Sequence, residues 1–258
     1  MKSRERMMLR LYYRVRATMH RAGLDVTRWP TDAPEVLAHT ALLSCGPDVV
    51  VDVGANDGGF ARDLRGYGYR GEIVSLEPGA AAFTRLKGHA IQDPAWHVHQ
   101  LAAGNYSGDA LLNIAGNDGA SSSILEMGSL HTKYAESAAY VSQETVRVTS
   151  LEEFAAKYGR GWVNPALKID TQGYEEPVLE GCGDWLNAVS AIRLELNLAD
   201  LYEGAWTWRE ALSWLEDRGF QLQTLVPGFS DRRSGKLLQV DAVVVRRHLG
   251  DFRKPRLR

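Results

Sequence analysis

The stretch Val49-Val50-Val51-Asp52-Val53-Gly54-Ala55-Asn56-Asp57-Gly58-Gly59-Phe60 decides the fold of this chain. A run of valines enters a glycine-rich turn, and a second apolar run, Ile73-Val74-Ser75-Leu76, ends in Glu77. A strand, a glycine turn, a helix and a second strand that ends in an acid about twenty residues after the turn are typical of a nucleotide-binding βαβ unit. The sequence therefore predicts an α/β protein whose ligand lies at the carboxyl ends of these strands.

The charge of the turn narrows the choice of ligand. Asp52 and Asp57 lie in it, and no Lys or Arg occurs between positions 49 and 61. These carboxylates would repel a diphosphate and attract S-adenosylmethionine, which carries a sulfonium and an ammonium group, while Glu77 would accept hydrogen bonds from the ribose hydroxyls. S-adenosylmethionine is therefore the predicted cofactor. An NAD-dependent oxidoreductase and a non-catalytic nucleotide-binding scaffold are the alternatives, since a glycine-rich turn can also serve packing alone.

Length and composition fit one enzyme-sized domain. The chain has 258 residues, of which 45% are apolar, enough for a large core. We place this domain at 49–247, after an N-terminal helix and lead-in at 1–48 and before a basic tail at 248–258. The net charge of −2 argues against nucleic acid as a partner. Cys45 and Cys182 have no metal-ligand spacing, so we expect free thiols, a reducing compartment and a cytoplasmic protein.

The N-terminal segment is basic and amphipathic. Seven Lys and Arg residues occur between positions 2 and 21, against the single acid Glu5. The apolar residues at helical spacing are Met8, Leu11, Tyr12, Val15 and Met19. Such a helix can lie on an anionic membrane surface, which would suit a lipid-linked substrate, or pack on the enzyme body or on a second subunit. We expect no membrane span, because no apolar run in the sequence has the necessary length.

The rest of the sequence alternates strand-like runs with helical patterns, which predicts helices on both faces of a mainly parallel sheet. We expect core strands at 49–53, 72–77, 96–101, 166–170 and 191–196, and a closing antiparallel pair at 220–226 and 238–245. Helices are expected at 58–66, 79–88, 151–158, 175–180 and 208–218. Residues 104–147 interrupt this alternation with an extra strand at 110–114 and a polar loop at 116–123.

Four blocks of the sequence resemble the FkbM family of S-adenosylmethionine-dependent methyltransferases. They are VVDVGANDGGFARDL (50–64), IVSLEPGAAAFTRL (73–86), LKIDTQGYEEPVLEG (167–181) and LLQVDAVVVRR (237–247). Leu101-Ala102-Ala103-Gly104 and Ser121-Ser122-Ser123 resemble the family's third-strand end and serine-rich loop. The similarity spans about 49–246. It implies the Rossmann-like class I methyltransferase fold, with a seven-stranded, mainly parallel sheet, helices on both faces and an antiparallel terminal hairpin.

The resemblance also implies cofactor-binding residues. The turn around the methionine part would be formed by Asp52, Gly54, Asn56 and Gly58. Glu77, followed by Pro78, would hold the ribose, and Ala102 and Ala103 would border the adenine. One position departs from many family members, which have Glu where this chain has Gln172. This difference removes one candidate base.

Methyl transfer to oxygen needs an in-line approach of the acceptor and a group that takes up the hydroxyl proton. Such groups belong at the carboxyl ends of the strands. Asp170 ends the fourth core strand, and Glu195 and Asn197 end the fifth and point to one side. We assign Asp170 as base or metal ligand, Glu195 as a second acid and Asn197 as the residue that orients the acceptor. Asp170 could instead cap the following turn, or pair with Lys168 and so be a poorer base.

The predicted acceptor-binding residues are Gln172, Tyr174 and Trp206, because two of them follow Asp170 directly and aromatic rings often face sugars. The resemblance implies an O-methyltransferase that acts on a small-molecule or glycan acceptor. A sugar hydroxyl of a glycolipid, a polysaccharide or a glycosylated natural product is the favoured target, and polyketide hydroxyls stay open. We predict no defined metal site, although carboxylates at neighbouring strand ends, Asp170 among them, could hold Mg²⁺.

Overall fold

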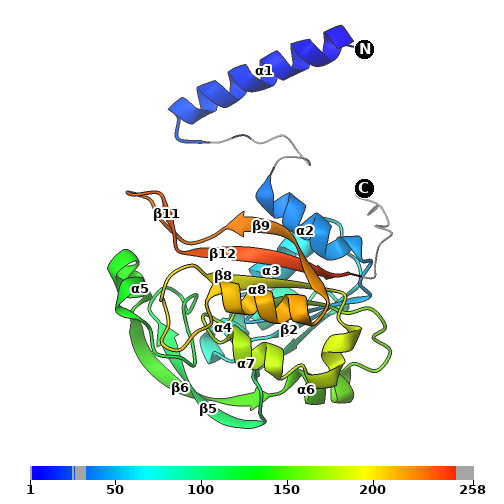
Figure 1. Ribbon diagram of the computed structural model, residues 1–258, viewed down its shortest axis with the longest axis vertical. Helices are drawn as coiled ribbons and strands as arrows, with labels where there is room; N and C mark the ends of the chain where they lie inside the picture. The colour runs from blue at the N-terminus through cyan, green and yellow to red at the C-terminus, as the bar shows by residue number, and fades with distance from the viewer. Residues whose placement is uncertain (1, 25, 27–32, 248–258) are drawn as a thin grey trace. The chain divides into compact units, whose positions relative to one another are not determined.

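A computed structural model of the chain describes residues 2–24, 26 and 33–247 (Figure 1). The chain forms two compact units, residues 1–37 and 38–258. Helix α1 (Lys2–Arg21) lies in the first unit, and helix α2 (Pro34–Ser44) begins there and continues into the second. Residues 38–44 therefore belong to the unit that holds the sheets. The basic tail predicted at 248–258 lies outside the described residues.

Seven strands form the central sheet, in the order β3-β2-β1-β7-β8-β12-β9. In chain order they are β1 (Val49–Val53), β2 (Glu72–Leu76), β3 (Trp96–His99), β7 (Ala166–Ile169), β8 (Ala191–Asn197), β9 (Phe220–Pro227) and β12 (Gln239–Arg246). The first five pair in parallel, and β12 runs antiparallel to both β8 and β9. The predicted mainly parallel sheet with its closing antiparallel pair is confirmed.

The sheet is covered on both faces, which explains why the sequence of β1 is apolar apart from Asp52. All five of its residues are buried, with Val49, Val51 and Val53 in one core cluster and Val50 in another. Helices α6 (Leu151–Tyr158), α7 (Glu175–Glu180) and α8 (Trp208–Asp217) contribute to the first cluster. Helices α3 (Gly59–Gly66) and α4 (Ala80–Ala90), with residues 38–44 of α2, contribute to the second.

A second sheet of three strands has the order β4-β6-β5. The strand β4 (Ala102–Ala103) pairs in parallel with β6 (Tyr140–Thr149), which pairs antiparallel with β5 (Gly108–Ala115). The strand predicted at 96–101 therefore ends at His99, because Ala102 and Ala103 leave the central sheet and pair with β6. The extra strand predicted at 110–114 is present and is longer than expected.

The remaining elements are short. They are helix α5 (Ser129–Tyr134), the 3₁₀ turns η1 (Glu136–Ala138) and η2 (Gly183–Ala188), and a small hairpin of β10 (Ser230–Asp231) and β11 (Lys236–Leu237). Helix α8 begins near its predicted start because Thr207 and Glu210 form a capping box there. The loop between β5 and α5 lines the pocket described next, together with residues of β4 and β5.

Candidate active site

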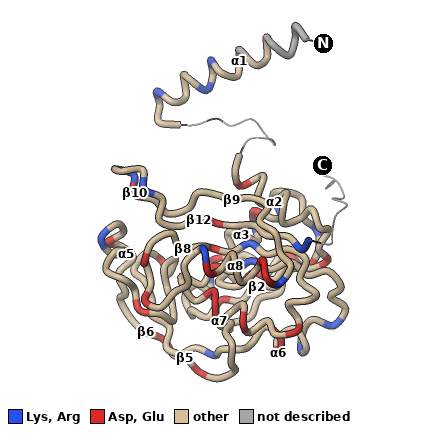
Figure 2. Tube along the Cα trace, viewed as in Figure 1, with Lys and Arg blue, Asp and Glu red and all other residues tan. Residues whose placement is uncertain are grey.

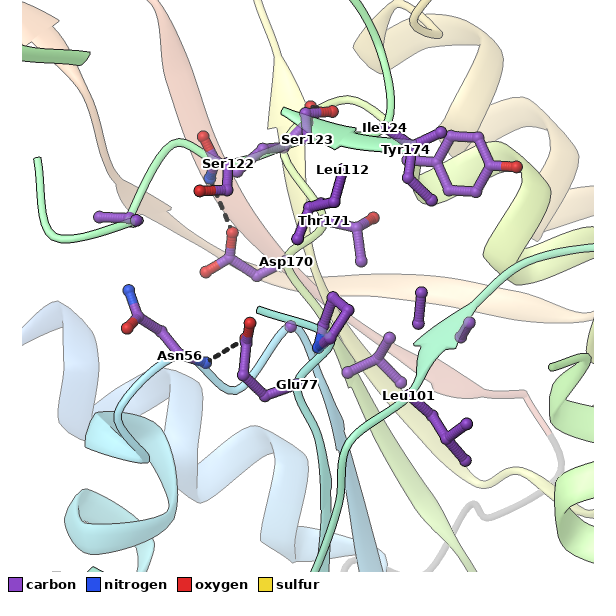
Figure 3. A pocket seen from close by; sticks show the side chains of 18 residues that line it. Asn56, Glu77, Leu101, Leu112, Ser122, Ser123, Ile124, Asp170, Thr171 and Tyr174 are labelled. Atoms are coloured by element: carbon purple, nitrogen blue, oxygen red, sulfur yellow. Dashed lines mark hydrogen bonds between the residues drawn. The ribbon is translucent and has the colours of Figure 1, made fainter. Parts of the chain in front are cut away.

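A pocket of about 760 Å³ opens at the carboxyl ends of β1, β2 and β7 (Figure 3). Its apolar side is lined by Leu101, Ala102, Ala103, Leu112 and Ile124. Its polar side holds Asn56, Glu77, Ser122, Ser123, Asp170 and Gln172. Figure 3 shows the carboxylates of Glu77 and Asp170 on the same side of this pocket. An apolar wall with a few convergent polar groups is typical of a cofactor site.

Glu77 follows β2, and its side chain is held at both carboxylate oxygens. Oε2 accepts the backbone N–H of Asn56 at 2.8 Å, and Oε1 accepts that of Gly79 at 2.8 Å. Burial raises the pKa of Glu77 to about 7, although these two hydrogen bonds favour the ionised form. Each oxygen still has a second lone pair. The carboxylate can therefore accept two further hydrogen bonds, as a ribose with two free hydroxyls would require.

Glycine is needed at position 54 because two strand ends meet there. Gly54 has a φ of +73°, and a Cβ at this position would lie 1.9 Å from the carbonyl oxygen of Asp170. Gly58 has a different reason for being glycine. It precedes α3 with a φ of +86°, and a Cβ would lie 2.7 Å from the ring of Trp96. Gly54 thus shapes the pocket, whereas Gly58 allows close packing behind it.

The two acids of the glycine-rich turn both have cationic partners. Asp52 is completely buried beneath the pocket, with Lys168 Nζ at 3.2 Å from its Oδ1. Burial raises the pKa of Asp52, and the Lys168 ammonium opposes that rise. Asp57 pairs with Arg62 at 3.0 Å on the surface. Neither acid lines the pocket, whereas the carboxyl groups of Glu77 and Asp170 do.

Asp170 and Glu195 are bridged by the side chain of Gln172. Asp170 lines the pocket with its side chain 40% exposed, and Lys168 Nζ lies 3.5 Å from its Oδ2. The amide nitrogen of Gln172 donates to Asp170 Oδ1 at 2.8 Å and to Glu195 Oε2 at 2.9 Å. Burial, together with the Asp170 carboxylate, raises the pKa of Glu195 well above its usual value. The Asp170–Lys168 ion pair that the sequence left open is present.

The turn that follows β7 is capped by Glu175 rather than by Asp170. The Glu175 carboxylate accepts the backbone N–H groups of Thr171 and Gly173, at 3.0 and 3.1 Å, and the Thr171 hydroxyl at 3.1 Å. Burial raises the pKa of Glu175 to about 7. Because Glu175 satisfies the turn, the Asp170 side chain is left to face the pocket.

A family model described as Methyltransferase FkbM domain matches residues 52–222. The chain belongs to this family. The search of curated proteins found no similar relative. Similar solved structures include an rRNA methylase from Streptococcus thermophilus, at 10% identity and a TM-score of 0.46 over 86% of this chain and 99% of that chain. Another is precorrin-6y C5,15-methyltransferase from Geobacter metallireducens, at 12% identity and a TM-score of 0.41 over 86% and 93% of the two chains.

As an FkbM domain, the chain is a methyltransferase, and S-adenosylmethionine is its cofactor. The predicted Rossmann-like class I fold is likewise confirmed. The two solved structures do not indicate an acceptor for this chain, because their sequence identity to it is too low. What the FkbM domain methylates must therefore be argued from its own residues.

Most of the residues predicted to bind the cofactor, to take part in catalysis or to bind the acceptor line the pocket of this FkbM domain. Those that do are Gly54, Asn56, Glu77, Pro78, Ala102, Ala103, Asp170, Gln172 and Tyr174. Those that do not are Asp52, Gly58, Glu195, Asn197 and Trp206. Asn197 and Trp206 line a neighbouring pocket of about 370 Å³, together with Tyr202, Trp208 and Arg209. The predicted acceptor residues are thus divided between two pockets.

The hydrogen bonds that Tyr202 and Gln239 make beside the pocket were not predicted from the sequence. Tyr202 donates its hydroxyl to Gln172 Oε1 at 2.6 Å. Gln239 donates to Glu195 Oε2 at 2.6 Å and to Asn197 Oδ1 at 3.2 Å. The signal for Gln239 was present, since it is a polar residue at the start of a mainly apolar strand. Its partner could not be known without the order of the strands.

Three further predictions concern metals, thiols and membranes. Within the described ranges, no three His, Cys, Asp or Glu side chains form a group that could hold a metal, and a role for Mg²⁺ stays a prediction. Cys45 and Cys182 are free thiols, as expected. No helix in the described part of the chain is long and apolar enough to cross a membrane.

Proposed function

We propose that the pocket binds S-adenosylmethionine and that the FkbM domain transfers the methyl group to a hydroxyl oxygen of a sugar. The acceptor would be a glycolipid, a polysaccharide or a glycosylated natural product. The observation that carries this proposal is the position of two carboxylates, Glu77 and Asp170, on the polar side of a pocket with an apolar opposite wall. When bound, S-adenosylmethionine supplies an electrophilic methyl group on a sulfonium sulfur.

The residues of the pocket fit each part of this cofactor. Glu77 keeps one free lone pair on each oxygen for the ribose hydroxyls. Leu101, Leu112 and Ile124 offer an apolar wall to the adenine. Asp170, beside the Gly54 turn, puts a carboxylate where the cationic methionine part would lie. The same two carboxylates would repel the diphosphate of NAD.

Asp170 is our proposed general base. A hydroxyl is a poor nucleophile while it keeps its proton, so a group within reach must remove it. Oδ1 of Asp170 accepts a hydrogen bond from the Gln172 amide at 2.8 Å, whereas Oδ2 has the Lys168 ammonium at 3.5 Å. Asp170 Oδ2 would take the hydroxyl proton, and the positive charge of Lys168 stays nearby throughout. A carboxylate in this role favours an oxygen acceptor over a neutral amine, which already has a free lone pair.

A sugar acceptor is supported by the aromatic residues beside the site. Tyr174 lines the cofactor pocket, and Trp206 and Trp208 line the neighbouring one. The guanidinium of Arg209 lies 4.3 Å from the centroid of the Trp208 ring. Aromatic faces next to polar side chains suit the apolar faces and hydroxyls of a sugar ring. The net charge of −2 does not suit a nucleic-acid acceptor.

The experiment incubates the protein with isotope-labelled S-adenosylmethionine and a glycolipid extract of the host, and identifies the product by mass spectrometry. We expect a labelled O-methyl group on a sugar. Asp170→Asn should lose about a hundred- to ten-thousand-fold in rate while it still binds S-adenosylmethionine. Asp109→Asn, which alters a surface ion pair with Arg147, is the matched control and should keep its activity. Full turnover in Asp170→Asn would remove Asp170 as the base.

Two control measurements separate the alternatives. Stabilisation against heating by NAD, and not by S-adenosylmethionine, would favour the oxidoreductase. EDTA should leave methyl transfer intact if no metal takes part. A loss of activity that added Mg²⁺ restores would instead indicate that a metal ion binds at the carboxyl ends of the strands.

We also propose that α1 brings a cytoplasmic enzyme to an anionic membrane surface. Between residues 7 and 21 the helix has basic residues and no acidic one, as Figure 2 shows for its described part. Met8, Leu11 and Val15, which share its apolar stripe, are exposed. A helix with one apolar and one basic face is suited to the boundary between lipid headgroups and acyl chains. This location would bring the enzyme to a glycolipid acceptor.

Vesicle co-sedimentation tests this contact. We expect binding to vesicles that contain phosphatidylglycerol, and much weaker binding to vesicles of phosphatidylcholine alone. Leu11→Ser combined with Val15→Ser should abolish binding, whereas Thr18→Ser should not. If the double variant changes the oligomeric state and the wild type ignores both vesicles, α1 packs on protein instead.

A further inference from the structure

The side chain of Gln172 has hydrogen bonds at both of its polar atoms. Nε2 donates to Asp170 Oδ1 at 2.8 Å and to Glu195 Oε2 at 2.9 Å. Oε1 accepts the hydroxyl of Tyr202 at 2.6 Å. Both amide hydrogens are therefore used by carboxylates, and neither is left for an acceptor. This arrangement differs from the acceptor-binding role that the sequence suggested for Gln172.

The backbone of Gln172 is also held in an uncommon conformation. Its φ of +55° lies in the left-handed region, which residues other than glycine rarely adopt. The hydroxyl of Ser123 donates to the carbonyl oxygen of Gln172 at 2.8 Å. Strained residues that their surroundings hold from several sides occur mainly at functional sites. Both the backbone and the side chain of Gln172 are thus fixed beside the pocket.

The orientation of the Gln172 side-chain amide decides whether Asp170 receives a hydrogen bond from it. With Nε2 toward the two carboxylates, Asp170 and Glu195 each receive a hydrogen bond. After a flip of the amide, its oxygen would face both carboxylates with no hydrogen between them. The Tyr202 hydroxyl donates to Oε1 and so stabilises the first orientation. Tyr202 is itself buried, with 3% of its surface exposed, and its ring packs edge-on against His131.

We propose that Gln172 and Tyr202 are positioning residues for Asp170. The Tyr202 hydroxyl fixes the Gln172 amide, and the amide fixes Asp170 Oδ1, so that Oδ2 faces the acceptor proton. Glu195 is the second anchor of the amide and not the base, because its Oε2 already accepts from Gln172 and Gln239 and it does not line the pocket. This inference rests on the proposed function, in which Asp170 removes the proton.

Tyr202→Phe tests the inference because it removes only the hydroxyl. With labelled S-adenosylmethionine and varied amounts of the glycolipid extract, we expect kcat to fall about ten- to a hundredfold, the loss typical of a displaced catalytic group. The apparent KM for the extract and the Kd of S-adenosylmethionine should change less than about twofold. Gln172→Leu should show the same pattern. Tyr69→Phe is the matched control. The Tyr69 hydroxyl donates a hydrogen bond to the Glu72 carbonyl oxygen at 3.2 Å, and the residue belongs to the core cluster that α3 and α4 cover.

The opposite kinetic pattern would overturn the inference. A raised KM with unchanged kcat in Gln172→Leu would make Gln172 an acceptor-binding residue. Unchanged kcat and KM in Tyr202→Phe would remove Tyr202 from the site. If the wild-type protein neither binds S-adenosylmethionine nor methylates the extract, the proposed function fails instead.

A measurement that needs no acceptor tests the geometry by itself. In NMR spectra of the wild type, the side-chain amide hydrogens of Gln172 should exchange with water at least about tenfold more slowly than those of the exposed Gln100. Tyr202→Phe should reduce this protection, and Tyr69→Phe should leave it unchanged. Equal exchange at Gln172 and Gln100 in the wild type would contradict the inference.

Discussion

The affinity for S-adenosylmethionine should depend on pH through Glu77. Burial raises the pKa of this carboxyl to about 7, so the free protein holds it mostly protonated at pH 5.5 and half ionised at pH 7. The backbone N–H groups of Asn56 and Gly79 occupy one lone pair on each oxygen. A protonated carboxyl would put its hydrogen where a ribose hydroxyl should donate. Only the ionised form can accept two ribose hydroxyls.

The size of the effect follows from the ionised fraction. With a pKa of about 7, that fraction rises about sixteenfold between pH 5.5 and pH 7.0. If only the ionised form binds, Kd should fall by the same factor, which corresponds to about 1.6 kcal/mol. The upper limit of pH 7.0 avoids titration of the amino group of the cofactor, which is expected between about 7.7 and 8.0. Isothermal titration calorimetry at several pH values measures Kd directly.

Two variants make this measurement specific. Glu77→Gln should bind more weakly at pH 7.0 and show a Kd that is nearly independent of pH. Glu175→Gln removes a second carboxyl with a pKa of about 7 that does not line the pocket, and it should keep the dependence of the wild type. A wild-type Kd that changes less than about twofold, or the same slope in Glu77→Gln, would refute the assignment of Glu77 to the ribose.

Three other substitutions test the residues that support the pocket from the turn after β1, from β7 and from α7. Gly54→Ala should abolish cofactor binding and lower the free energy of unfolding by at least about 2 kcal/mol in urea, because its Cβ would lie 1.9 Å from the Asp170 carbonyl oxygen. Lys168→Met should cost about 3–5 kcal/mol, since it leaves Asp52 buried without its cation, and adding Asp52→Asn should restore part of that loss. The pKa of Glu175 is raised from 4.5 to about 7, so the folded state keeps a proton that the unfolded state releases. The contribution of Glu175 to stability is complete below pH 4.5 and is lost as the pH rises through 7. The free energy of unfolding should therefore fall by up to about 3 kcal/mol over this range. Glu175→Gln should flatten the dependence of this free energy, measured in urea, on pH.

The central sheet was predictable because its strands are buried on both faces. Apart from Asp52 in β1 and Lys168 in β7, both strands are apolar between turn residues, and both lie where they were expected. The second sheet was harder to predict. In β6, only Val146 and Val148 are buried, so most of this ten-residue strand shows no apolar periodicity. The strand β6 was therefore not among the strands predicted from the sequence.

The residues at the carboxyl ends of strands were predictable because topology alone places them near one another. Asp170 and Glu195 are examples, since β7 and β8 are adjacent and parallel. The contacts of Tyr202 and Gln239 were not predictable in this way. Gln239 lies opposite Asn197 only because β12 inserts between β8 and β9. Tyr202 reaches Gln172 from the loop after β8, and no local pattern fixes the path of that loop.

The acids that line the pocket differ from the acids of the glycine-rich turn, which the sequence suggested would attract the cofactor. Asp52 is paired with Lys168, and Asp57 with Arg62, so the charges of the turn are largely balanced within the protein. The carboxylates that face the pocket are Glu77 and Asp170. Glu77 can serve the ribose, while Asp170 can attract the cationic methionine part and then remove the acceptor proton. Asp170→Asn should therefore weaken the binding of S-adenosylmethionine about twofold more than that of S-adenosylhomocysteine, which lacks the sulfonium charge; the difference is small because Lys168 opposes the carboxylate. An equal loss for the two ligands would show that Asp170 contacts the amino acid part, which they share, and not the reacting centre.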